Sequence, residues 1–218
     1  MTKRFALPIW VAAAAMMTGR AEIIDRVAVS VGNSAIAASD LDREIRITAF
    51  LNGVTADFSA RGKRATAERM VEQRLIQREL ELSRYPEPDP AAVDSELADF
   101  RQRHFKTDAE FQRALTREGI TEKEVREELL WQLKLLRFVE GRFRPSVQIT
   151  EQQIQDYFEK TVKPAAEAAH PGQAISLDDY RDDIEETLAG QFADQELDKW
   201  LKETRQRTEI IYHDEVFQ

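Results

Sequence analysis

The 218-residue chain contains no cysteine, which excludes disulfide scaffolds, thiolate metal sites and cysteine nucleophiles. Its eight glycines and seven prolines are too few for a low-complexity chain. The only histidines are His104, His170 and His213, which lie far apart and away from acidic clusters at metal-ligand spacing. The hydrolase, zincin, phosphate-loop and dinucleotide motifs are also missing. We therefore predict that the chain is not an enzyme, with no catalytic, cofactor-binding or metal-binding residues.

Positive charge is in short supply, because 31 Lys and Arg face 40 Asp and Glu, a formal net charge of -9. An acidic chain repels phosphate backbones, so we expect no nucleic-acid partner. Paired carboxylates such as Asp182-Asp183 and Glu127-Glu128 occur on predicted helices beside Arg or Lys. This pattern is typical of solvated helix faces with pairs four residues apart.

Long hydrophobic runs are absent apart from one near the N-terminus. Lys3 and Arg4 precede an apolar run of about 13 residues, and small residues follow at Gly19 and Ala21. The run is shorter than the ~20 residues that cross a bilayer, so we predict a signal peptide over residues 1–21 rather than an uncleaved anchor helix. We expect a periplasmic mature chain, residues 22–218, with a net charge of -12 and no membrane span.

Two short regions near the chain ends have the pattern of β-strands. Residues 24–31 alternate apolar and polar side chains, with Val27, Val29 and Val31 expected on one face. Gly32-Asn33-Ser34 predicts a turn, and residues 35–37 would form the return strand of a hairpin. Residues 209–213 predict a last strand, for which the hairpin is the only available partner. We therefore expect a small antiparallel sheet that joins the two ends of a mainly α chain.

Between these strands the sequence predicts helices with clear start signals. Ser39 with Asp42, Thr107 with Glu110, Thr121 with Glu124 and Thr150 with Gln153 have capping-box spacing, and Asp89-Pro90 has N-cap spacing. A helix over residues 61–85 has an apolar stripe that includes Leu75 and Leu82. Residues 163–174, with two prolines, predict a connector. Ser176 then caps a long helix over residues 177–207, roughly 45 Å in length.

The helix that begins after Thr121 has two apolar faces. One carries the stripe Val125, Leu129, Leu133 and Leu136, and the other carries Trp131 and Phe138, seven residues apart. The second face either packs against another helix or stays open for a partner. Most other aromatic residues have helical spacing that is typical of a core.

Residues 23–41, IIDRVAVSVGNSAIAASDL, resemble the start of mature SurA-type periplasmic chaperones. Residues 149–158, ITEQQIQDYF, are similar to the family segment that leads into a parvulin-type prolyl isomerase domain. In the family, a long helix and a short strand then return to complete the N-terminal module, and residues 180–213 resemble that return. The resemblance implies a chaperone module over residues 22–162, completed by residues 176–218.

One departure from the family is large. Only 18 residues separate Phe158 from Leu177, whereas a parvulin domain has about 90–100 residues. We therefore expect residues 163–175 to be a linker in place of the isomerase. The resemblance implies an ATP-independent holdase for unfolded outer-membrane proteins or peptides. Trp131, Phe138 and Phe143 are candidate client-binding residues, solely because the second apolar face of their helix could stay open for a partner. An envelope adaptor with one specific partner and a prolyl isomerase are the alternatives, and a domain-swapped homodimer stays open.

Overall fold

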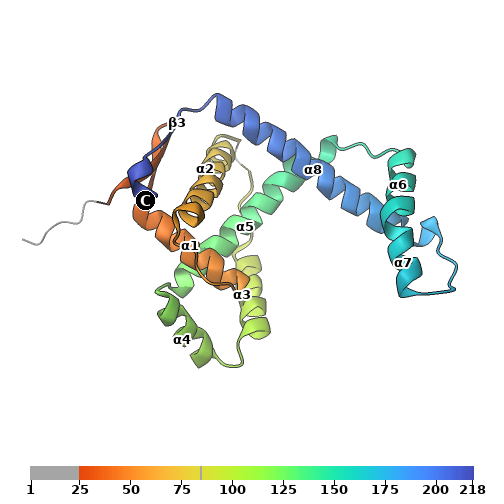
Figure 1. Cartoon of the computed structure of the whole chain (residues 1–218), viewed down its shortest axis with the longest axis horizontal. Helices are drawn as coiled ribbons and strands as arrows, with labels where there is room; N and C mark the ends of the chain where they lie inside the picture. The colour runs from red at the N-terminus through yellow and green to blue at the C-terminus, as the bar shows by residue number, and fades with distance from the viewer. Residues whose placement is uncertain (1–24, 84) are drawn as a thin grey trace, which may run out of the picture.

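The computed structural model describes residues 25–83 and 85–218, so the predicted signal peptide lies outside the described residues. The fold is mainly α with one small antiparallel sheet, as the sequence predicts (Figure 1). The elements are β1 Val27–Val31, β2 Ser34–Ala37, α1 Ala38–Asn52, α2 Ala60–Ser83, α3 Pro90–His104, α4 Asp108–Glu118, α5 Glu122–Arg142, α6 Glu151–Tyr157, α7 Lys163–Ala169, α8 Arg181–Gln206 and β3 Ile210–Tyr212.

The sheet has the strand order β2-β1-β3, which confirms that the C-terminal strand pairs with the N-terminal hairpin. The predicted alternation is wrong at its start. Val27 is 40% exposed whereas Ala28 is fully buried. The reason is a register irregularity between Val27 and Val29, of the kind a β-bulge makes, which turns the next side chain to the other face.

Most predicted helix starts are confirmed. The hydroxyl groups of Thr121 and Thr150 accept hydrogen bonds from the backbone of Glu124 and Gln153, and the Asp89 carboxylate accepts from the Ala91 N–H. The Ser39 cap is wrong, because strand β2 runs directly into α1 at Ala38.

At this junction Asp40 reaches back to accept a bond of 3.2 Å from the Ala37 N–H, and the Ser39 hydroxyl bonds to Asp25 instead. The side chain of Asp40 therefore supports the first turn of α1 from within the helix.

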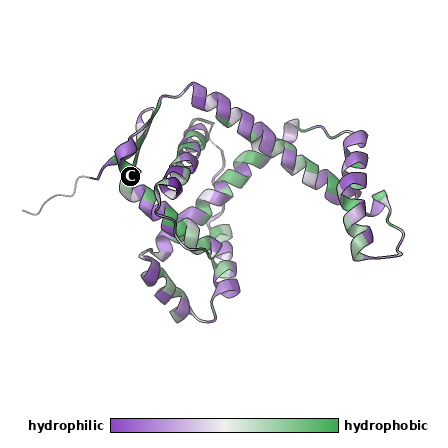
Figure 2. Cartoon of the chain, viewed as in Figure 1, coloured by the Kyte–Doolittle hydropathy of each residue, from purple (hydrophilic) through white to green (hydrophobic). Residues whose placement is uncertain are grey.

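Three clusters of apolar side chains hold the fold together. The first, the body core, joins the sheet to α2, α5 and α8 and includes Val29, Val71 and Phe138. The second joins α1, α3, α4 and α5, and the third joins α6 to the N-terminal half of α8. Helix α8 thus extends from the body to a separate arm, and Figure 2 shows it as mostly hydrophilic with hydrophobic positions at intervals.

Helix α5 is shared between two of these cores. Val125 and Leu129 are buried in the second cluster, whereas Trp131 and Phe138 are buried in the body core. The predicted stripe therefore fails at its end, where Leu136 is 56% exposed. The predicted stripe of α2 is likewise wrong at its end, because the side chain of Leu82 is 72% exposed.

The predicted connector is partly helical. Residues 158–162 form a π turn, in which the Lys163 N–H donates to the Phe158 carbonyl, and α7 continues from Lys163 to Ala169. Pro164 lies in the first turn of α7. The long C-terminal helix also begins later than predicted. Ser176 caps a 3-10 turn over Leu177–Asp179, and α8 begins at Arg181 because the backbone of Tyr180, with φ −120° and ψ 0°, is not helical. Leu177 and Tyr180 pack against the third cluster.

Candidate functional site

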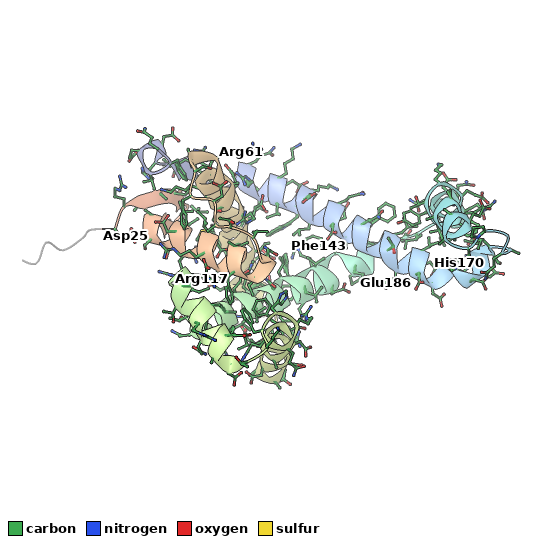
Figure 3. The ribbon with its side chains drawn as sticks, turned by 60° about the horizontal axis from the view of Figure 1, so that its bottom comes forward. Asp25, Arg61, Arg117, Phe143, His170 and Glu186 are labelled. Carbon is green, nitrogen blue, oxygen red and sulfur yellow. The ribbon has the colours of Figure 1, made fainter. Side chains whose placement is uncertain are left out.

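The three residues predicted to bind clients all lie in the body core. Trp131 is 9% exposed, Phe138 is fully buried and Phe143 is 7% exposed. The ring of Phe138 makes edge contacts with Tyr85, Phe143 and Trp200 at centroid distances of 5.5 Å each. Figure 3 shows Phe143 near the crossing of α5 and α8.

These aromatic contacts attach α8 to the body. The Arg142 guanidinium lies 5.5 Å from the Trp200 ring and bonds to Glu79 of α2 at 2.8 Å, which closes the cluster toward solvent. The sequence left open whether the face with Trp131 and Phe138 packs against another helix or stays open for a partner. In the structure it packs against α8. Client contact by these three residues stays a prediction, and Trp131 lines a surface pocket.

That pocket is part of a groove between α5 and the proline-rich α2–α3 connection. Two hollows of about 350 and 490 Å³ share Glu87, Glu127 and Leu130 as walls. Lys134 pairs with the Glu87 carboxylate at 2.7 Å, and Arg137 donates to the Glu87 carbonyl at 2.9 Å. Lys123 and Arg126 of the same rim pair with Glu127 and Asp94, so most of its charged side chains already have an ionic partner.

A wider pocket lies between the end of α1, the loop to α2, and helices α3 and α4. It encloses about 610 Å³, and we call it the aromatic pocket. Four phenylalanines from three different segments line it: Phe50, Phe58, Phe100 and Phe105. The Phe50 ring lies 5.6 Å from Phe100 and stacks on Phe105 at 5.9 Å. The result is an apolar floor that is built from helix ends rather than from one helix face.

The rim of the aromatic pocket keeps apolar side chains in solvent. Val54 is 63% exposed and Phe58 is 41% exposed, although the hydrophobic effect favours their burial. Both lie in the loop that follows Gly53, whose φ of 64° ends α1 in a left-handed turn. Exposed apolar residues that gather at a hollow are typical of a binding surface.

Arg46 holds this pocket in shape. Its guanidinium lies 5.4 Å from the Phe58 ring centroid and donates to the Glu118 carbonyl at 3.4 Å. Glycine at 119 leaves room for that guanidinium, because an added Cβ would meet the Arg46 Nη1 at 2.8 Å. The side chain therefore joins α1, the loop residue Phe58 and the end of α4.

Sequence reasoning treated residues 54–60 as a loop and overlooked the aromatic pocket. The signal that could have found it is the presence of two apolar residues, Val54 and Phe58, outside any helical periodicity. Such residues have no helix face to fill. Phe100, by contrast, has the helical spacing that predicts a core position, and it is 7% exposed.

One carboxyl group in the body has a strongly perturbed pKa. Burial raises the pKa of Glu128 on α5 to about 7, and the nearby carboxylate of Glu44 on α1 adds to the rise. A hydrogen bond of 3.0 Å from Gln132 and the charge of Arg69 act in the opposite direction. A Glu with this pKa changes its charge near neutral pH at the contact between α1 and α5.

Within residues 25–83 and 85–218, no group of three or more acidic or histidine side chains is arranged to hold a metal ion. In the same part of the chain, no helix combines the length and the apolar character needed to cross a bilayer. All buried side-chain polar atoms of the described residues have hydrogen-bond partners. The described part of the chain thus leaves apolar surface, rather than unpaired polar groups, as its distinctive feature.

Comparison with known proteins gives one informative similarity. No family model matches the chain. Over 150 residues the chain is 26% identical to a protein named Chaperone SurA from Alkalilimnicola ehrlichii, which covers 67% of this chain. The same match covers 34% of that protein, so the chain spans about a third of this relative's length. The similarity supports a SurA-like relationship of this chain at the level of the family.

Proposed function

We propose that this protein is an ATP-independent periplasmic chaperone of the holdase type, whose clients are unfolded outer-membrane proteins or peptides. The observation that carries the proposal is the similarity to a protein named Chaperone SurA over two thirds of the chain. The aromatic pocket, with Val54 and Phe58 exposed at its rim, supplies a surface on which such binding would occur.

The binding step needs no nucleotide. An aromatic side chain buries roughly 150–250 Å² on entering a pocket, and at about 25 cal/mol per Å² this is worth about 4–6 kcal/mol before costs. Association costs about 4–15 kcal/mol in lost freedom, so a single contact is weak and several contacts are needed for retention. Weak individual contacts let the client leave without an energy source.

Charge keeps the loaded protein apart from its neighbours. The chain carries 40 acidic against 31 basic side chains, so complexes of chaperone and client repel one another. The loss of residues 1–21 as a signal peptide would remove three of those basic residues and place the protein in the periplasm. Residues 163–175, in this proposal, stand where the family has an isomerase domain, so the protein itself has no isomerase activity.

The test uses residues 22–218 and an outer-membrane β-barrel protein unfolded in urea. On dilution without ATP, light scattering by the client should fall as the chaperone approaches a stoichiometric ratio. The variant Phe58→Ser should protect less well, because it removes an exposed ring from the aromatic pocket. Leu136→Ser is the matched control, since it removes an exposed apolar side chain from α5 that does not line this pocket.

Unchanged scattering with a folded protein would contradict the proposal and favour the adaptor alternative, which a pull-down with one dominant stoichiometric partner would support. If Phe58→Ser and Leu136→Ser lost protection of the client to the same extent, the protein would still be a chaperone, but the aromatic pocket would not be its client-binding site. A proline-peptide isomerisation assay tests the remaining alternative, a prolyl isomerase. We expect the rate of isomerisation not to exceed the uncatalysed rate.

A further inference from the structure

Strand β3 lies at one edge of the sheet, and its hydrogen bonds show which residues face inward. The Gly32 N–H donates to the Glu209 carbonyl at 2.8 Å, and the His213 N–H donates to the Ala28 carbonyl at 2.9 Å. Ile211 lies opposite Ser30 between these two bonds. In an antiparallel pair the bonded positions recur every second residue, so Glu209, Ile211 and His213 turn their backbone groups toward β1.

It follows that Ile210 and Tyr212 turn their backbone N–H and C=O groups away from β1. Among the described residues, none forms a hydrogen bond to these outward groups. A row of unpaired backbone groups at a sheet edge is a template for another strand. The edge is short, but it offers two donors and two acceptors in the spacing of a β-ladder.

The side chains of β3 divide between the two faces of the sheet. Ile210 and Tyr212 pack against the body core and are partly buried. Ile211 is on the opposite face and 47% exposed, and His213, on the same face, contacts the Ser30 hydroxyl at 3.3 Å. Glu209 is exposed two residues before Ile211. The outer face of β3 therefore presents Glu, Ile and His in that order.

We propose that a second copy of this chain pairs with β3 along this edge, as an antiparallel strand related by a two-fold axis. The register follows from the outward groups. Ile210 of each copy exchanges hydrogen bonds with Tyr212 of the other, which places the axis at Ile211. Ile211 then faces its own counterpart, and Glu209 of each copy lies opposite His213 of the other. The two three-stranded sheets become one six-stranded sheet.

The charge pattern selects a second copy over an unrelated extended segment. The outer face of β3 is complementary to itself when reversed, since an acidic residue meets an imidazole on both sides of an apolar pair. Any extended peptide could use the backbone groups, but a second copy also brings a complementary side chain to both Glu209 and His213 at once. The contact is small beside standard interfaces, so the dimer is weak and forms at high protein concentration. It does not depend on chaperone activity.

Because the natural chain has no cysteine, a single cysteine tests the geometry directly. Residues opposite each other in a non-hydrogen-bonded pair have Cα atoms about 4.5 Å apart, within the range that a disulfide spans. The variant Ile211→Cys should therefore form a covalent dimer in a glutathione redox buffer. Leu136→Cys, which is 56% exposed on α5, is the matched control and should stay monomeric.

The register has its own test. Glu209→Cys should not cross-link to itself, because its counterpart lies about 14 Å away along the paired strands. A mixture of Glu209→Cys with His213→Cys should give the mixed dimer. Without cysteines, sedimentation equilibrium should show a dimer that grows with concentration and is lost in Ile211→Lys, which places two ammonium groups at the axis.

The proposal is overturned if Ile211→Cys dimerises no faster than Leu136→Cys, or if Glu209→Cys cross-links to itself as readily. Cross-linking of Ile211→Cys to a single-cysteine unfolded client, but not to its own copy, would also overturn it. That last outcome would assign the edge to an extended client segment instead.

Discussion

The pKa of Glu128 leads to a quantitative prediction about stability. Its pKa rises from an ordinary 4.5 to about 7 in the folded chain, mainly because its carboxyl group is buried beside Glu44. The unfolded chain therefore releases this proton more easily than the folded chain does. The folded state binds more protons between pH 4.5 and 7, so the free energy of unfolding falls as the pH rises through that window.

The magnitude follows from the same pKa values. At about 1.4 kcal/mol for each pKa unit, ionisation of Glu128 costs the folded chain about 3 kcal/mol. That cost is absent below pH 4.5, where the group is protonated in both states, and complete above pH 7. The variant Glu128→Gln keeps an acceptor for Gln132 and removes the charge. We expect it to match the parent at pH 4.5 and to be more stable by up to about 3 kcal/mol at pH 8.

The assay is urea unfolding of residues 22–218 at a series of pH values, followed by the fluorescence of Trp131 and Trp200 in the body core. Glu127→Gln is the control, because it removes an exposed carboxylate from the adjacent position on α5. If Glu128→Gln retains the parent's pH dependence between 4.5 and 7, Glu128 is not the group that titrates there. Equal effects of both variants would instead indicate a general response to net charge.

Two further predictions concern the packing of the body and the support of the aromatic pocket. Phe138→Ala removes a fully buried ring that contacts Trp200. We expect the free energy of unfolding in urea to fall by about 3–5 kcal/mol. An unchanged midpoint would contradict the conclusion that this ring attaches α8 to α5. Gly119→Ala should cost about 1–2 kcal/mol for its φ of 67° plus the displacement of Arg46, whereas Gly53→Ala, with φ 64° and no atom within 4 Å of an added Cβ, should cost the backbone part alone. Thermal melts of the two glycine variants make the comparison, and equal losses would show that Arg46 moves freely.

Features that depend on residues close together in the chain could be predicted from the sequence. The turn at Gly32-Asn33 follows from a glycine that adopts a φ of 54°. The helix starts after Asp89, Thr121 and Thr150 follow from side chains that accept hydrogen bonds from backbone groups two or three residues away. The pairing of the chain ends was also predictable, because a lone strand at residues 209–213 required a partner and the hairpin was the only one available.

The helix faces were predictable only in part, because a helix buries whatever its neighbours cover. On α5 the periodicity of the sequence places Leu136 and Phe138 on two different apolar faces. Packing against α8 buries Phe138, whereas Leu136 stays exposed. In the predicted connector, Pro164 indicated a break, whereas the π turn before it lets the helix continue.

The candidate sites could not be predicted, because they depend on how distant segments pack together. The aromatic pocket joins Phe50, Phe58 and Phe105 from segments up to 55 residues apart, and no local pattern places their rings together. The raised pKa of Glu128 depends on Glu44 from another helix, and the free edge of β3 depends on which strand lies at the centre of the sheet. Periodicity records which residues can share a face, whereas the packing of distant segments decides which faces water can still reach.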